Sequence, residues 1–125
     1  MWFTIKFFTA FFATFVIGAA LLSTPATEYT EESYAGLCVV EFNAQFNSQN
    51  SVPWIEELSD CNGRRVDIAA SPDQQTEYKI VVVPTIIIFN EGAEVKRYQA
   101  NIMMELEVQK ETIQHDIDEI IMSDF

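Results

Sequence analysis

The sequence predicts an α/β sandwich built on one small central sheet. Two near-continuous apolar runs, at residues 37–42 and within KIVVVPTIIIF at 79–89, have the composition of strands that are covered on both faces. Segments with helix-start signals or helical apolar spacing separate and follow these runs. The expected order is β-α-β-α-β-β-α, and its opening strand–helix–strand unit requires a parallel pair with a right-handed crossover.

Local signals define the elements of the first half of the domain. Gly36 bounds a buried strand at residues 37–42. A helix capped by Asn47 or Ser51 is expected next, with Pro53 near its first turn. The Asn-Gly pair at 62–63 would end that helix.

The second half alternates in the same way. A strand at 65–69 leads through Ser71-Pro72 into a short helix that ends near residue 78. Residues 79–92 form a strand that runs into a glycine-bearing turn, and 94–100 form its returning hairpin partner. Isoleucines and a valine at helical spacing predict a closing amphipathic helix across 108–121.

The N-terminal residues 1–26 are typical of a signal peptide or a membrane anchor. Residues 7–22 carry no charge, and Lys6 supplies a weak positive start. A span needs about 20 apolar residues, and residues 2–22 reach that length if Lys6 extends to the membrane surface. Both alternatives predict an exported domain, periplasmic or extracytoplasmic. A polar linker at 27–36 would join this segment to a single domain at 37–125.

The charge balance excludes some classes of partner. The chain has 19 acidic and 7 basic residues, a net charge of −12, and every acidic residue lies after the apolar segment. Nucleic acid binding needs clustered Lys and Arg, so no nucleic acid partner is expected. One histidine and two separated cysteines offer no metal site, and the chain has no glycine-rich phosphate loop, so no cofactor is expected.

Several segments together resemble the thioredoxin family. VVEF at 39–42 followed by a polar turn resembles the family's central strand and active-site box, and VDI at 66–68 its next strand. VVPT at 82–85 resembles the element that contains its cis-proline, and FNEG at 89–92 resembles its hairpin turn. The resemblance covers about residues 36–100 and implies a thioredoxin-like sandwich.

The box departs from the family pattern. Where thioredoxins carry Cys-x-x-Cys, this chain has Asn47, Ser48, Gln49 and Asn50. Disulfide exchange needs a thiolate nucleophile and a resolving thiol, and an amide supplies neither. Ordinary dithiol exchange at the box is therefore excluded. Asn47 could cap a helix, and both amides could contact the backbone of a partner.

The resemblance also implies roles for residues outside the box. Glu41 matches an acid that the family buries beneath the box, and Arg65 would pair with it from the adjacent strand. Pro84 would be cis. The backbone around Val83, Pro84 and Thr85 would pair with an extended bound peptide, a contact that needs no cysteine.

Cys38 and Cys61 allow two interpretations. Cys38 begins the central strand and Cys61 lies just before the adjacent parallel strand, so a disulfide could join them if their Cα atoms lie within about 7 Å. Alternatively, Cys38 is a small core residue and Cys61 a residue at a helix end.

Met103 and Met104 lie in the connection before the last helix. Adjacent methionines either fill the core or face a partner or a membrane.

Three functional hypotheses follow. The first is a non-catalytic thioredoxin-like domain that binds a protein or peptide near the cis-proline loop. The second is a thiol-disulfide oxidoreductase that uses Cys38 or Cys61. The third is a structural subunit of a membrane assembly that packs through residues 2–22 and the methionines.

Overall fold

The computed structural model describes residues 34–124. In chain order the elements are β1 (Leu37–Asn43), the 3-10 helices η2 (Gln45–Asn50) and η3 (Ile55–Glu57), β2 (Asn62–Asp67), α2 (Pro72–Glu77), β3 (Thr85–Asn90), β4 (Ala93–Gln99) and α3 (Lys110–Ser123). The signal peptide or anchor expected at 1–26, and most of the linker expected at 27–36, lie outside these residues.

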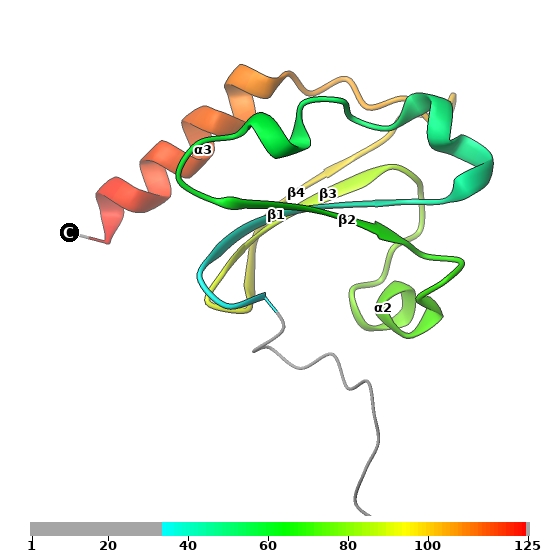
Figure 1. Ribbon diagram of the computed structural model, residues 1–125, viewed down its shortest axis with the longest axis horizontal. Helices are drawn as coiled ribbons and strands as arrows, with labels where there is room; N and C mark the ends of the chain where they lie inside the picture. The colour runs from blue at the N-terminus through cyan, green and yellow to red at the C-terminus, as the bar shows by residue number, and fades with distance from the viewer. Residues whose placement is uncertain (1–33, 125) are drawn as a thin grey trace, which may run out of the picture.

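A four-stranded sheet with the order β2-β1-β3-β4 forms the centre of the domain. β1 pairs with β2 in parallel, and β3 pairs antiparallel with both β1 and β4. The segment containing η2 and η3 lies with α3 on one side of the sheet, and α2 lies on the other (Figure 1). The predicted α/β sandwich with a thioredoxin-like arrangement is therefore confirmed.

The sheet separates two hydrophobic clusters. The cluster on the α2 side contains Tyr34, Cys38, Val40, Phe42, Ile80, Val83, Ile87 and Phe89. The cluster on the α3 side contains Val39, Val52, Ile55, Leu58, Ile86, Ile88, Ile113 and Ile117. β1 and β3 supply alternate side chains to both clusters, which is why their sequences read as continuous apolar runs.

The helix expected after β1 does not form, and this part of the prediction is wrong. Residues 44–61 contain two short 3-10 turns, and Ser51 and Leu58 after them have extended backbone. Pro53 lacks an N–H for a helix ladder, and side chains from the sheet bond the backbone at Val52 instead. Asn47 is not a helix cap, because it lies inside η2 with φ of −115°.

Element boundaries also differ from those expected. The Asn-Gly pair at 62–63 opens β2 instead of ending a helix, and β3 begins only after Pro84. Tyr34, expected in the linker, is buried and stacks on Phe89 with ring centroids 4.6 Å apart. The folded domain therefore includes the last residues of the expected linker.

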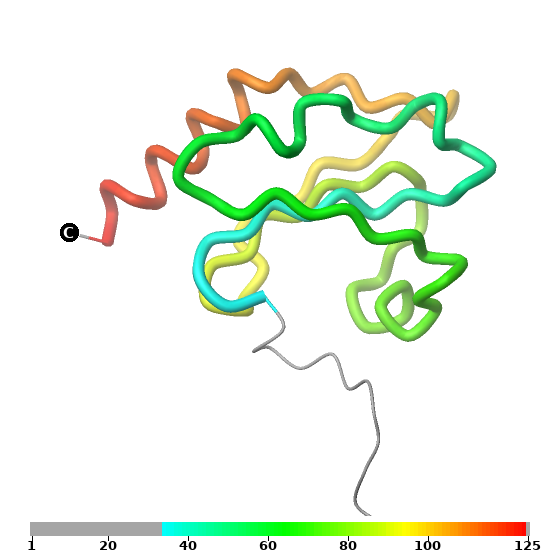
Figure 2. The backbone as a smooth tube through the Cα atoms, in the orientation of Figure 1, coloured from blue at the N-terminus to red at the C-terminus, as the bar shows by residue number. Residues whose placement is uncertain are grey.

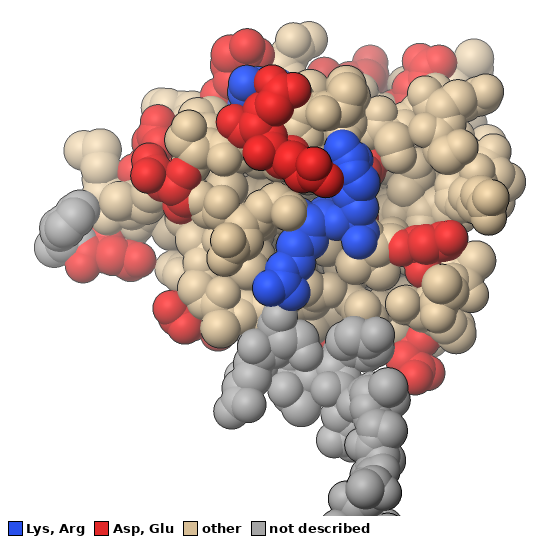
Figure 3. All heavy atoms as spheres, in the orientation of Figure 1, with Lys and Arg blue, Asp and Glu red and all other residues tan. Residues whose placement is uncertain are grey.

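Acidic side chains are spread over the face of the molecule in Figure 3, and the Lys and Arg atoms visible on this face lie mainly in one band. Within residues 34–124, no helix has both the length and the hydrophobicity to cross a membrane.

Candidate functional site

Three segments that are distant in sequence meet beyond the carboxyl end of β1. They are η2, which carries the Asn-Ser-Gln-Asn box, the loop that leads into β3, and the loop that follows β4 (Figure 2). The box thus lies where three loops at one end of the sheet come together.

The side chain of Asn47 connects these segments. It is 2% exposed, and its Nδ2 donates to the main-chain oxygens of Val83 at 3.4 Å and Met104 at 3.2 Å. Nδ2 also lies 3.2 Å from Oδ1 of Asn43 at the end of β1. Buried polar groups are costly unless they are bonded, and the two Nδ2 hydrogens of Asn47 are shared among these three acceptors.

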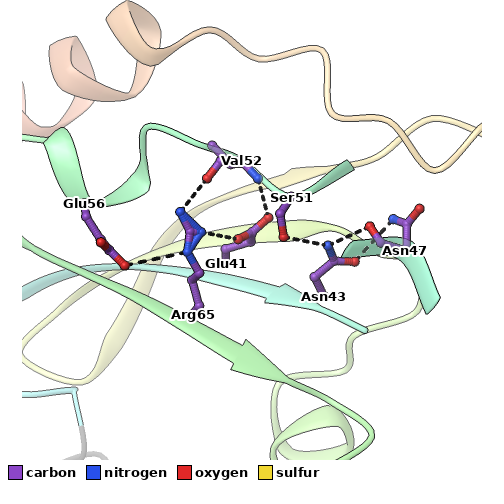
Figure 4. A network of polar contacts seen from close by, with 7 residues as sticks. All are labelled: Glu41, Asn43, Asn47, Ser51, Val52, Glu56 and Arg65. Carbon is purple, nitrogen blue, oxygen red and sulfur yellow. Dashed lines mark hydrogen bonds and ion pairs between the residues drawn. The ribbon is translucent and has the colours of Figure 1, made fainter. Parts of the chain in front are cut away.

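Two further asparagines complete this amide cluster. Asn50 donates from Nδ2 to Oδ1 of Asn47 at 2.8 Å. Asn43 donates from Nδ2 to the main-chain oxygen of Asn47 and to Oγ of Ser51, both at 3.2 Å (Figure 4). Ser48 and Gln49, the middle residues of the box, are exposed. The two asparagines of the box therefore point into the domain.

Glu41 and Arg65 meet beneath the box, on the same register position of β1 and β2. The Nη1 of Arg65 lies 3.3 Å from Oε1 of Glu41, which is 1% exposed. Glu41 accepts a hydrogen bond from the Val52 N–H at 2.7 Å, and Arg65 donates from Nη2 to the Val52 oxygen at 2.8 Å (Figure 4). The pair thus bonds both main-chain polar groups of Val52.

Burial raises the pKa of the Glu41 carboxyl above its ordinary value of 4.5. The Val52 N–H, the Arg65 guanidinium and the Ser51 hydroxyl oppose this rise but do not cancel it. The ionised form of Glu41 therefore depends on these three partners.

An open cavity of about 290 Å³ lies between the box and β2. Its lining includes Glu41, Asn43, Ser48, Ser51 and Arg65. Glu41 and Arg65 already bond each other and Val52, and Asn43 bonds Asn47 and Ser51. The cavity therefore offers room for a side chain or small polar group but few unused buried donors.

The residues implied for peptide binding lie behind the box. The Val83–Pro84 peptide bond is cis, and Val83, Pro84 and Thr85 are all buried. The Val83 oxygen accepts from Asn47, and the Pro84 oxygen accepts from the Ala100 N–H at 3.1 Å. An extended peptide that bonds the Val83 carbonyl would have to compete with Asn47.

The two cysteines are free thiols. Cys38 is buried in the cluster on the α2 side, and Cys61 packs against the cluster on the α3 side. Burial, with smaller contributions from Cys38 and Asp60, raises the pKa of the Cys61 thiol to about 11. Because the thiolate is the reactive form, Cys61 is a poor nucleophile at neutral pH.

Three residues of this site were missed at the level of sequence. Asn43 lies four residues before Asn47. Because the chain between them is not a regular helix or strand, this spacing did not indicate that the two side chains meet. Gly63 packs so closely that a Cβ built on it would lie 2.1 Å from the Ile55 oxygen. Asn101 organises the loop after β4, and its position in the unassigned stretch NIMMELEVQ was the only signal.

Comparison with solved structures gives the same fold. A mutant thioredoxin from Halobacterium salinarum is 18% identical with a TM-score of 0.60, covering 77% of this chain and 85% of its own. Thioredoxin from Fasciola hepatica is 22% identical with a TM-score of 0.53, covering 67% and 80%. Oxidised thioredoxin from Plasmodium falciparum is 17% identical with a TM-score of 0.54, covering 72% and 85%.

No protein-family model matches the sequence, and comparison with curated proteins finds no match. The likeness to the solved structures shows that the chain has a thioredoxin-like fold, and its box lacks paired cysteines. Within residues 34–124, no group of three His, Cys, Asp or Glu side chains is arranged to hold a metal ion.

Proposed function

We propose that this protein is a non-catalytic thioredoxin-like domain, exported or tethered to a membrane, that binds a protein or peptide beside its cis-proline loop. The observation that carries the proposal is the position of Asn47. Its amide is buried and bonded to the loops before β3 and after β4. The box thus fixes the shape of a loop surface and carries no thiol for disulfide exchange.

The cysteines support the same proposal. A redox pair needs two thiols within reach of each other and a lowered pKa on the attacking thiol. Cys38 is fully buried, and burial raises the pKa of the Cys61 thiol to about 11, the opposite of the lowered pKa that an attacking thiol needs.

Insulin-disulfide reduction tests the absence of redox chemistry. The full chain in a nonionic detergent, with dithiothreitol as reductant, should reduce insulin no faster than the reductant alone. A Cys38→Ser/Cys61→Ser variant is the matched control. Turnover that exceeds the background in the natural protein and disappears in the variant would show a thiol oxidoreductase and overturn the proposal.

Photo-crosslinking tests the binding surface. A benzophenone amino acid replaces Phe46 on η2, which is 75% exposed, or Met122 on α3, which is 73% exposed. Position 46 should give a discrete adduct in the cells that produce the protein, and the equally exposed position 122 should not. Equal labelling from both positions, or none from either, would contradict a partner at the box.

The mass of the recovered protein tests export. Loss of residues 1–26 indicates a cleaved signal peptide, and the intact chain in the membrane fraction indicates an anchor. An intact chain in the cytosolic fraction contradicts both alternatives.

A further inference from the structure

The loop after β4 carries an unusual exposed apolar surface. Ile102 is fully exposed, Met103 is 67% exposed and Met104 is 40% exposed. Phe46 lies next to Asn47, whose amide bonds the Met104 oxygen. We call these four residues, Phe46, Ile102, Met103 and Met104, the apolar cap. Single exposed apolar residues are ordinary, but a group on adjoining segments marks an interaction site.

The cap is held in a defined shape. Oδ1 of Asn101 accepts from the N–H groups of Met103 at 2.8 Å and Glu105 at 3.1 Å. The Asn101 N–H donates to the Glu105 oxygen, and the Met104 N–H donates to the Asn101 oxygen, both at 3.0 Å. The backbone hydrogen bonds of this turn and the hydrogen bond from Asn47 hold Ile102, Met103 and Met104 where their apolar side chains are exposed to water. A folded chain gains nothing from that exposure alone.

A hollow lies between the end of β4, the segment that follows the cap and the start of α3. It has a volume of about 420 Å³, and its lining includes Tyr98, Leu106, Glu107 and Val108. Residues 106–109 directly follow the turn of the cap. The hollow is large enough for one or two side chains, and the chain leads into it directly from the turn that carries Ile102, Met103 and Met104.

The negative charge of the residues around this surface favours a positively charged binding partner. Residues 44–51, 81–85 and 100–109 contain two acids, Glu105 and Glu107, and no Lys or Arg. A second copy of this chain would bring the same glutamates together, and an anionic lipid surface would repel them. A basic partner is attracted, and it also offsets the net charge of −12.

We propose that the apolar cap and the adjoining hollow bind an amphipathic helical segment that has apolar residues on one face and Lys or Arg on the other. Methionines adapt to the shape of such faces, and a helix supplies side chains without needing the Val83 carbonyl that Asn47 occupies. The basic residues of the partner would lie against Glu105 and Glu107. This inference rests on the proposed binding function and names the class of its partner.

Peptide binding tests the inference. The probe is a fluorescein-labelled peptide of about 18 residues with Leu on one helical face and Lys on the other. The full chain is held in phosphatidylcholine nanodiscs, and empty nanodiscs give the lipid background. We expect the Leu/Lys peptide to bind at least tenfold more tightly than the same design with Glu in place of Lys, and than a Leu/Lys peptide scrambled to remove the apolar face.

Variants locate the binding surface. Ile102→Gln/Met103→Gln should weaken binding at least tenfold, whereas Met122→Gln, at a similarly exposed methionine on α3, should change it less than twofold. Glu105→Gln/Glu107→Gln should weaken binding several-fold and reduce its sensitivity to salt. Equal affinity for the Lys and Glu peptides, or no effect of the Ile102→Gln/Met103→Gln change, overturns the inference.

The two proposals can fail separately. A crosslink from position 46 in cells, without binding of the Leu/Lys peptide, overturns the class of partner and leaves a protein-binding domain. Failure of both the crosslink and the peptide removes the binding function itself.

Discussion

Two segments cover the same face of the sheet by different means. α3 bonds its own backbone through a helix ladder and buries Ile113 and Ile117. The segment at 44–61 buries Val52 and Ile55 in the same cluster but has only two short 3-10 turns. Its main-chain polar groups therefore need partners from elsewhere in the domain.

Buried polar side chains supply those partners. Glu41 and Arg65 bond Val52, Asn43 bonds the Asn47 oxygen, and the Asn47 amide bonds the two neighbouring loops. A helix needs no such support for its interior. The polar residues in and beneath the box therefore have a structural explanation, because they bond the main chain of one irregular segment and of its neighbouring loops.

The irregular segment packs closely against β2 at Gly63. Gly63→Ala would place a Cβ 2.1 Å from the Ile55 oxygen and 2.9 Å from its carbon, so backbone must move. We expect a loss of about 3 kcal/mol in the free energy of unfolding. Urea unfolding of the full chain in nonionic detergent measures it. Asn62→Ala, at an exposed neighbour, should cost less than about 0.5 kcal/mol, and equal costs would refute the close approach.

The side-chain amide of Asn47 joins the irregular segment to the loops before β3 and after β4. Asn47→Ala leaves the oxygens of Val83 and Met104 without this donor, and we expect a cost of about 2.5 kcal/mol. Asn50→Ala removes only one half-exposed bond and should cost about 0.5 kcal/mol. Urea unfolding compares the two variants. A smaller cost at position 47 than at position 50 would mean that the box is not the structural connection we describe.

Much of the fold could be predicted from the sequence, but the irregular course of the segment after β1 could not. The apolar runs of β1 and β3 and the isoleucine spacing of α3 are local patterns that packing reinforces. The segment after β1 has apolar residues at 54, 55 and 58 that also fit a helix. Its actual course depends on Gly63, Glu41 and Arg65, which are contacts between distant residues and leave no periodic signal.

The candidate site divides in the same way. The cis bond at Pro84 followed from the resemblance of residues 82–85, and the approach of Glu41 to Arg65 followed from the register of adjacent strands. The burial of Asn47 did not, because its acceptors are main-chain oxygens of Val83 and Met104, and any residue type carries such an oxygen. The exposure of Met103 and Met104 shows that core filling was the wrong alternative for these two residues.

The stability contributed by the Glu41–Arg65 pair should depend on pH. Arg65→Ala leaves Glu41 with the Val52 N–H but without its cation, and we expect a cost of about 2 kcal/mol at pH 7, reduced because Arg65 is partly exposed. The folded-state pKa of Glu41 is already raised, so the stability contributed by this group is present below pH 4.5 and is lost as pH rises through the folded-state pKa.

Removing Arg65 takes away one of the groups that lower this pKa, so the variant should lose more stability over that rise in pH than the natural protein. The cost of Arg65→Ala should therefore shrink toward pH 4. Urea unfolding at several pH values measures it. Lys110→Ala breaks an exposed ion pair with Glu57 and should cost less than about 0.5 kcal/mol. A cost of Arg65→Ala that does not vary with pH would contradict a role through Glu41.

The smallest expected effect is on Cys61, at the edge of the irregular segment. A pKa of about 11 leaves little thiolate at pH 7.5, so iodoacetamide should modify Cys61 on the order of 100-fold more slowly than an unperturbed thiol. The rate should rise about tenfold per pH unit until it levels off near the pKa. Cys38, which is fully buried, should react only after unfolding in urea. Mass spectrometry of the modified chain separates the two sites. Rapid modification of Cys61 at neutral pH would mean that this thiol is activated, and it would make the irregular segment a redox element as well as a structural one.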